Sequence, residues 1–186
     1  MGGYSSRCGW KKLQLLCKNE ILNEIKKRCI LGAGIIKLIK NRIYLDNCCF
    51  NRPYDDQSNL NVHLETEAKI FIQNEILNKN FELAWSFMMD YEISSNPFPD
   101  RQIAFLNWKT IAAVDIDPEE EILNKGRELS GKNIKKKDAL HIVCAVKAEC
   151  EYFLTTDGKI LNKSIPEIKI MNPLDFIRQL YTGDVL

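Results

Sequence analysis

Two aspartates follow short, strongly apolar segments, where a parallel sheet would place a reactive site. Asp46 comes directly after the segment 43–45, and Asp157 follows the segment 152–156. Because open parallel sheets bind ligands outside the carboxyl ends of their strands, both carboxylates are candidate site residues. Turn formation or helix capping is the ordinary alternative role for an aspartate after a strand.

Two further acids lie on predicted helices. Asp138 begins a helix whose body is otherwise apolar over 139–145, and Glu92 lies on the helix after a predicted strand at 81–85. A carboxylate at a helix N-terminus can simply stabilise the helix dipole, which is the alternative role for Asp138. A solvated helix face is the alternative for Glu92, and Asp90 is its rival as the second acid.

These four acids predict a metal-dependent hydrolase. Carboxylates gathered in one pocket repel each other unless protons or a cation neutralise them. Oxygen ligands suit Mg²⁺ or Mn²⁺ rather than zinc, and no Cys-x-x-Cys pair occurs in the chain. A divalent cation can activate water and stabilise charge on a scissile phosphate, which is the chemistry of metal-dependent nucleases.

Basic residues near the acids are candidate contacts for a phosphate backbone. Arg52 lies in the connection after the first strand, and Lys137 ends the lysine run 135–137 directly before Asp138. Lysine and arginine side chains commonly bind phosphates. Local turn chemistry around Pro53 and a solvated loop at 135–137 are the respective alternatives.

Hydroxyl and imidazole groups are the remaining candidates. Thr155 or Thr156 could donate a hydrogen bond to a carboxylate or to water. His141 lies one turn after Asp138, and we expect it to be a packed helix residue rather than a general base.

The elements that must position these residues alternate from position 43 onward. The patterns predict strands at 43–45, 81–85, 111–116, 152–155 and 168–171, and helices at 63–77, 87–93, 101–108, 118–130, 137–150 and 173–180. We expect Asp117 to cap the helix that starts at Pro118. Such alternation predicts a central parallel sheet flanked by helices in an α/β fold.

The chain divides into a basic extension and an acidic body. Its 186 residues and 21.5 kDa suggest one domain with a short appendage. Residues 1–40 contain nine basic and two acidic residues, whereas residues 41–186 contain seventeen basic and twenty-three acidic ones. We therefore predict a basic N-terminal extension over 1–41, partly helical near 11–28 or disordered, and one domain over 42–186.

Composition favours a cytoplasmic protein. Apolar residues make up 45% of the chain, which is enough for a hydrophobic core. No apolar run approaches the roughly 18 uncharged residues of a membrane span, and lysines interrupt the first apolar segment where a signal peptide would need one. The seven cysteines, an odd number, do not suggest a disulfide framework.

Four segments of the chain resemble the motifs of PIN-domain proteins of the VapC-like ribonuclease and toxin group. They occur in family-like order and spacing at 43–57 (IYLDNCCFNRPYDDQ), 86–97 (SFMMDYEISSNP), 137–145 (KDALHIVCA) and 153–157 (FLTTD). The resemblance implies a PIN-like three-layer fold with an acidic pocket for Mg²⁺ or Mn²⁺. It covers residues 42–178 and leaves the first forty residues without a counterpart.

The resemblance also assigns roles residue by residue. It implies that Asp46, Glu92, Asp138 and Asp157 are the catalytic metal ligands, directly or through water. Asn47 lies where the family often has a small polar residue beside the first acid. Asn47, Arg52, Thr156 and Lys137 are then the expected substrate contacts.

The expected function is a Mg²⁺- or Mn²⁺-dependent endoribonuclease that hydrolyses single-stranded or structured RNA, as the toxin of a type II toxin–antitoxin system. The resemblance implies a cognate antitoxin and a homodimer as partners, and the absence of a long apolar run predicts no membrane partner. The alternative is a non-catalytic PIN module that binds RNA or a protein partner and lacks or displaces one of the acids. A haloacid-dehalogenase phosphatase would need a second aspartate where this chain has Cys48.

Overall fold

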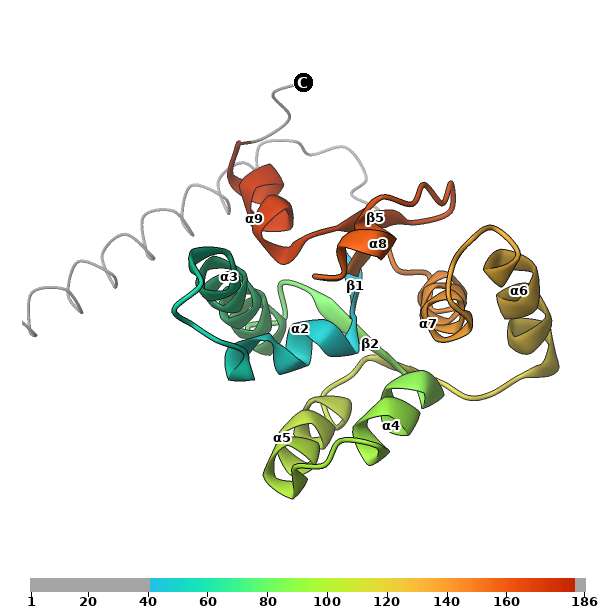
Figure 1. The fold of residues 1–186 in the computed structure, drawn as a ribbon, viewed down its shortest axis with the longest axis horizontal. Coiled ribbons are helices and arrows are strands. Elements are labelled where there is room, and N and C mark those ends of the chain that lie inside the picture. The colour runs from blue at the N-terminus through green and yellow to red at the C-terminus, as the bar shows by residue number, and fades with distance from the viewer. Residues whose placement is uncertain (1–40, 183–186) are drawn as a thin grey trace, which may run out of the picture. The chain divides into compact units, whose positions relative to one another are not determined.

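The computed structural model describes residues 41–182, drawn in colour in Figure 1, with side chains through Tyr181. The predicted basic extension and its helix near 11–28 lie outside these residues. No helix in the described range is long and apolar enough to span a membrane. Four cysteines fall in this range, and all are free thiols: Cys48, Cys49, Cys144 and Cys150.

A five-stranded parallel sheet forms the centre of the fold. Its strands are β1 (Arg42–Leu45), β2 (Glu82–Ser86), β3 (Val114–Ile116), β4 (Tyr152–Leu154) and β5 (Lys169–Met171). They lie in the order β3-β2-β1-β4-β5, and Tyr44 of β1 pairs with Ala84 of β2 and Phe153 of β4. The three central strands are almost wholly buried, which explains the apolar runs at 43–45, 83–85 and 152–154.

Helices cover both faces of this sheet. Within the described range they are α2 (Asn47–Asn51), the 3₁₀ helix η1 (Arg52–Tyr54), α3 (Leu60–Leu77), α4 (Phe87–Ser94), α5 (Pro99–Lys109), α6 (Glu120–Ser130), α7 (Lys136–Lys147), α8 (Gly158–Leu161) and α9 (Pro173–Thr182). Figure 1 shows α3 and α9 on one side of the sheet and α6 and α7 on the other. This three-layer α/β architecture confirms the predicted fold class and is consistent with a PIN-like fold.

Several boundaries differ from the sequence-based prediction. The expected connection after β1 folds into α2 and η1, which are too short to show helical periodicity. Helix α6 begins at Glu120 with Glu119 as its N-cap, so the prediction of Asp117 as the cap was wrong. Helix α7 ends at Lys147 rather than at 150, because the backbone turns into the left-handed region at Glu149, with φ of 55°.

The strand order brings the carboxyl ends of β2, β1 and β4 side by side along one edge of the sheet. Strand β1 is central, with β2 on one side and β4 on the other. The chain moves outward in one direction through β2 and β3, then crosses back to β4 and β5. Such a reversal of strand order leaves a crevice at the carboxyl ends of the strands, where ligands bind in open α/β sheets.

Candidate metal centre

Asp46 lies at this edge, immediately after β1. Its side chain is only 7% exposed, and its Oδ2 accepts a hydrogen bond from the Thr155 hydroxyl at 2.7 Å. The Cys48 thiol lies 3.1 Å from the same oxygen. Asp46 occupies the N-cap position of α2 but its carboxylate makes no capping hydrogen bond. Helix capping therefore does not account for this acid.

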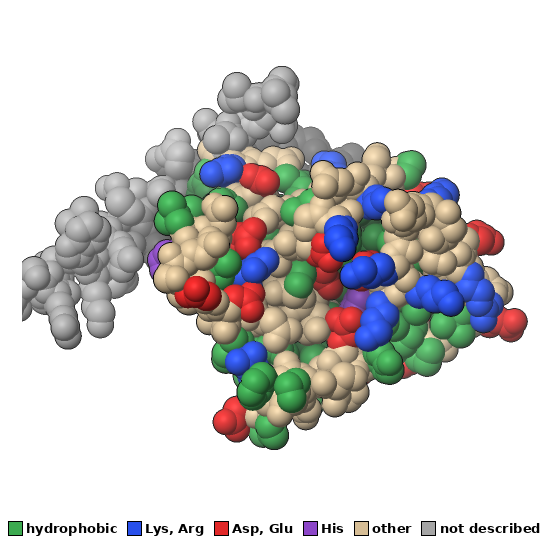
Figure 2. Space-filling view, viewed as in Figure 1, with side chains coloured by type: hydrophobic (Ala, Val, Ile, Leu, Met, Phe, Trp, Pro, Cys, Tyr) green, Lys and Arg blue, Asp and Glu red, His purple; other side chains and the backbone are tan. Residues whose placement is uncertain are grey.

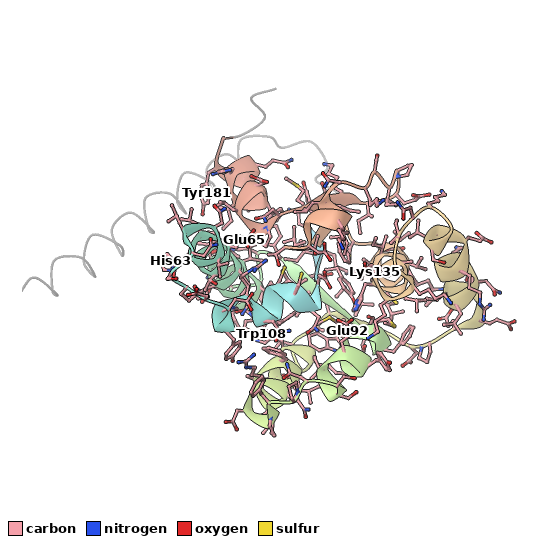
Figure 3. All side chains as sticks on the ribbon, viewed as in Figure 1. His63, Glu65, Glu92, Trp108, Lys135 and Tyr181 are labelled. Atoms are coloured by element: carbon pink, nitrogen blue, oxygen red, sulfur yellow. The ribbon has the colours of Figure 1, made fainter. Side chains whose placement is uncertain are left out.

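Glu92 and His141 converge on Asp46 from two different helices. One ligand atom from each of the three side chains lies within 4.8 Å of the other two. Glu92 comes from α4 and His141 from α7, which pack against each other; Figure 3 labels Glu92. Their Oε2 and Nε2 atoms are 3.5 Å apart. This acid–acid–imidazole cluster is the principal candidate site among the described residues.

The ring of His141 is held through its Nδ1 atom, on the side away from the acids. Its Nδ1 lies 2.8 Å from the Tyr44 hydroxyl, which in turn lies 2.6 Å from the hydroxyl of Ser86. The side chain is 2% exposed, and its Nε2 makes no hydrogen bond of ordinary length within the described chain. The nearest partner of this buried nitrogen is Glu92 Oε2 at 3.5 Å, which is long for a hydrogen bond, so a cation bound between the acids would satisfy it better.

The electrostatics of Glu92 favour its ionised form. His141 is the main cause of a lowered pKa for this carboxyl, and the burial of Glu92 opposes it. A hydrogen bond from the Asn47 side chain and the charge of Lys137 lower the pKa of Glu92 further. An ionised carboxylate is the form that binds a cation.

Asp138 lies beside the cluster, where the negative charges of other acids disfavour its ionised form. It occupies the first turn of α7, whereas Lys135 is the N-cap, so Asp138 is not the cap of this helix. Burial and then the charge of Asp46 raise the pKa of Asp138, Lys135 lowers it, and Asp157 raises it. This mutual repulsion is what a cation would relieve.

Asp157 takes the structural role of a cap. It is the N-cap of α8, and its Oδ1 accepts a hydrogen bond from the Lys159 amide at 2.7 Å. Its own amide donates to the Thr155 hydroxyl at 3.1 Å, so Thr155 links it to Asp46. Asp157 contributes charge beside Asp138 but no ligand atom to the cluster of three.

The structure brings Glu92, and not Asp90, to Asp46. The Asp90 carboxylate accepts from the Trp85 indole at 2.9 Å and pairs with Lys109 at 2.7 Å. Asp90 is thus engaged by its own partners, apart from the cluster.

Asn47 and Lys137, two of the expected substrate contacts, lie near Glu92. Asn47 hydrogen-bonds the Glu92 side chain, and its Oδ1 accepts from the side-chain amide of Asn51 at 3.3 Å. Lys137 is exposed, and its ammonium lies 4.9 Å from the centre of the Tyr91 ring. Both side chains are therefore within the surroundings of the cluster.

Arg52, another expected contact, is engaged by the protein through its side chain, whereas Thr156 is engaged only through its backbone and its buried hydroxyl has no hydrogen-bond partner in the described chain. The guanidinium of Arg52 lies 2.9 Å from Glu65 and 3.0 Å from Asp55, and its Nη2 donates to the Thr156 carbonyl at 3.5 Å. The Thr156 amide donates to the Cys48 sulfur at 3.2 Å. Arg52 thus joins α3 to the turn after β4.

Sequence reasoning placed His141 among packed helix residues, whereas the structure also places it in the cluster. Its spacing of three residues from Asp138 was the available signal, because such positions share one face of a helix. Packing and site membership are compatible here, since Tyr44 holds one ring nitrogen and the acids face the other.

No known family model matches this chain, and no curated protein does either. Among solved structures, a chain of the crystal structure of VapBC2 from Rickettsia felis bound to a DNA fragment from their promoter is similar. The match covers 70% of this chain and 98% of that chain, with 20% sequence identity and a TM-score of 0.41. Function is therefore inferred from the site itself.

Proposed function

We propose that this protein is a metal-dependent endoribonuclease whose reaction centre is the cluster of Asp46, Glu92 and His141. The observation that carries the proposal is the convergence of two carboxylates and a buried imidazole nitrogen whose nearest partner is Glu92 Oε2, at the long distance of 3.5 Å. A structural role alone would leave that nitrogen with only this long contact, and a buried polar group without a good partner costs up to about 1–3 kcal/mol. A divalent cation between the three side chains removes this cost.

Asp46, Glu92 and His141 would hold the cation, with Asp138 next to them and Asp157 further out. The cation supplies a positive charge that promotes the ionisation of water and stabilises charge developing on a phosphate. The chain's own contribution is orientation: Thr155 holds Asp46, Asn47 holds Glu92, and Tyr44 holds the ring of His141. Outer-shell partners of this kind set the direction and basicity of ligands.

The choice of metal follows from the donor set. Two carboxylates suit Mg²⁺ or Mn²⁺, whereas an imidazole nitrogen favours first-row transition ions over Mg²⁺. We therefore propose Mn²⁺ as the better cofactor, with Mg²⁺ as the weaker one.

The sequence resemblance to VapC-like PIN proteins extends the proposal in two ways. It indicates RNA as the substrate, and it indicates the role of a toxin that is restrained by an antitoxin. The four acidic motifs in family-like order support both extensions. Cytoplasmic location and a homodimer belong to the same extension.

A non-catalytic module that binds RNA or a protein is the second candidate. The position of Asp157 favours it, because this acid caps α8 and adds no ligand atom to the cluster. Such a module would bind its partner equally well with and without divalent cations.

Cleavage of a labelled single-stranded RNA by the full chain tests the proposal. We expect cleavage with Mn²⁺, slower cleavage with Mg²⁺ and none in excess EDTA. Asp46→Asn should lower the rate about a hundredfold or more, because even outer-shell changes at metal sites cost 10–100-fold. Asp90→Asn is the matched control on α4, outside the cluster, and should remain active.

Undiminished cleavage in EDTA, or in Asp46→Asn, would contradict the nuclease proposal. Tight RNA binding by the wild type without cleavage under any metal condition would favour the non-catalytic module. Arrest of growth on expression, relieved by Asp46→Asn, would support the toxin role, and normal growth would count against it.

A further inference from the structure

A cavity of about 550 Å³ opens beside the cluster, between the start of α7 and helix α8. Asp138 forms part of its wall, together with Lys135, Lys159 and Lys163. Asp138 is also the residue whose pKa is raised by the charge of Asp46. The cavity therefore adjoins the proposed metal centre, and Asp138 lies between the two.

The charge of the cavity is positive. Three lysines and a single acid are the charged residues of its wall. On the face seen in Figure 2, lysine and arginine side chains crowd around acids and a histidine near the middle of the molecule. The acidic cluster thus has a basic border on this side, to which a negatively charged ligand would be attracted.

These lysines are not neutralised by the protein. Within the described range, neither Lys135, Lys159 nor Lys163 makes an ion pair with a carboxylate, although Lys135 lowers the pKa of Asp138 through its charge. Other lysines there do have acidic partners, as Lys125 has Glu121 at 2.7 Å. Unpaired cations around a cavity are available for an anion from outside the chain.

The backbone adds to the same field. Helix α7 begins at Lys136, and Lys135 at its N-cap offers no capping side chain. The first N–H groups of a helix are therefore left for another acceptor, and the helix dipole favours negative charge at this end. Figure 3 labels Lys135 at α7 and Glu92 on α4, the helix that packs against α7.

We propose that the pocket of Lys135, Lys159 and Lys163, termed the lysine pocket, binds a phosphate of the RNA strand beside the phosphate that is cleaved. The inference rests on the proposed function, since a strand with one phosphate at the acidic cluster extends across Asp138 into this pocket. A polyanion explains why a centre of carboxylates has an unpaired cationic border. The lysine pocket holds the strand, and the cluster performs the chemistry.

Lys159 and Lys163 are the residues to substitute, because Lys135 also acts on Asp138. Binding of a labelled single-stranded RNA by the full chain is measured in EDTA, where cleavage is absent, over a series of salt concentrations. Lys159→Gln/Lys163→Gln should weaken binding about tenfold for each lysine. The slope of log K against log salt should become shallower by about 0.7 for each contact that is lost.

Lys125→Gln and Lys147→Gln are the matched controls. Lys125 on α6 pairs with Glu121, Lys147 at the end of α7 pairs with Glu119 at the N-cap of α6, and neither lysine borders the lysine pocket. They should leave the affinity and the salt slope unchanged. With metal present, the double variant should raise KM and leave kcat within about twofold, because it loses binding away from the reacting phosphate.

The outcomes separate this inference from the proposed function. If the wild type binds and cleaves RNA while Lys159→Gln/Lys163→Gln keeps its affinity and salt slope, the lysine pocket is not a phosphate site and the nuclease proposal stands. If the wild type binds no RNA, both proposals fail. Loss of affinity in the control variants to the same extent would show general charge attraction and would overturn the lysine pocket.

Discussion

The imidazole of His141 connects the buried core to the proposed metal centre. The Tyr44 hydroxyl contacts both His141 Nδ1 and Ser86 Oγ. When Tyr44 donates to Ser86, it can accept the proton of Nδ1, and Nε2 then presents a lone pair to Asp46 and Glu92. When the arrangement is reversed, Nε2 carries the proton and donates toward Glu92. A cation bound by Nε2 would select the first arrangement.

His141→Gln should therefore alter the preference between metals. The substitution removes the nitrogen donor, so Mn²⁺ affinity should fall by about tenfold while Mg²⁺ affinity changes little. Calorimetric titration of the RNA-free protein with each ion measures this directly. Asp46→Asn serves as the reference, because it should weaken both ions. Equal losses for Mn²⁺ and Mg²⁺ in His141→Gln would show that the imidazole is not a ligand.

At the scale of elements, close packing between α6 and α7 holds the helix that carries Asp138 and His141. A Cβ atom on Gly126 of α6 would lie 2.5 Å from Leu140 Cδ2 and 3.1 Å from its Cγ. Only glycine allows the two helices to approach this closely without moving Leu140. The position of α7 against α6 therefore depends on the absence of a side chain at Gly126.

Gly126→Ala should destabilise the protein by about 1 kcal/mol. Overpacking costs about 1–3 kcal/mol, and the better helix propensity of alanine offsets up to about 1 kcal/mol. Urea unfolding of Gly126→Ala, Leu140→Ala and the double variant forms a mutant cycle. In the Leu140→Ala background the same change should be neutral or stabilising, because the clash is gone. An equal cost in both backgrounds would place the strain elsewhere.

For the whole molecule, a buried lysine lowers the stability. Lys69 of α3 is 7% exposed, and its ammonium lies 5.6 Å from the centre of the Phe50 ring. Burial lowers the pKa of Lys69 to about 8. Between pH 8 and its ordinary value near 10.5, the unfolded chain binds more protons than the folded one. The contribution of Lys69 to the free energy of unfolding therefore rises with pH across that window, and it is most unfavourable at pH values below the window.

Lys69→Met should raise the free energy of unfolding by about 2 kcal/mol at pH 7, because it keeps the apolar volume and removes the buried charge. The gain should shrink as the pH approaches 10. Urea unfolding at both pH values measures this difference. Lys79→Met, at an exposed position after the same helix, is the control and should change stability little at either pH. A gain that does not depend on pH would show that charge burial is not its cause.

Much of the fold could be predicted from the sequence because its signals are local. Apolar runs of strand length, helical spacing and the Asn172–Pro173 start of α9 each depend on neighbouring residues, and Asn172 does accept from the Leu174 amide at 2.9 Å. Helices α2 and α8 were missed because five and four residues carry too little periodicity. Helix α6 began later than predicted, at Glu120, and Glu119 at its N-cap makes no side-chain capping hydrogen bond.

The sequence by itself determined where carboxylates follow strands and begin helices, and so which acids could gather at one edge of a parallel sheet. Only the tertiary structure decided between Glu92 and Asp90, joined Arg52 to Glu65, made Asp157 a cap and placed the Nε2 of His141 among the acids. The physical reason is that these outcomes depend on partners far apart in the chain, whose distances arise only when helices pack on the sheet.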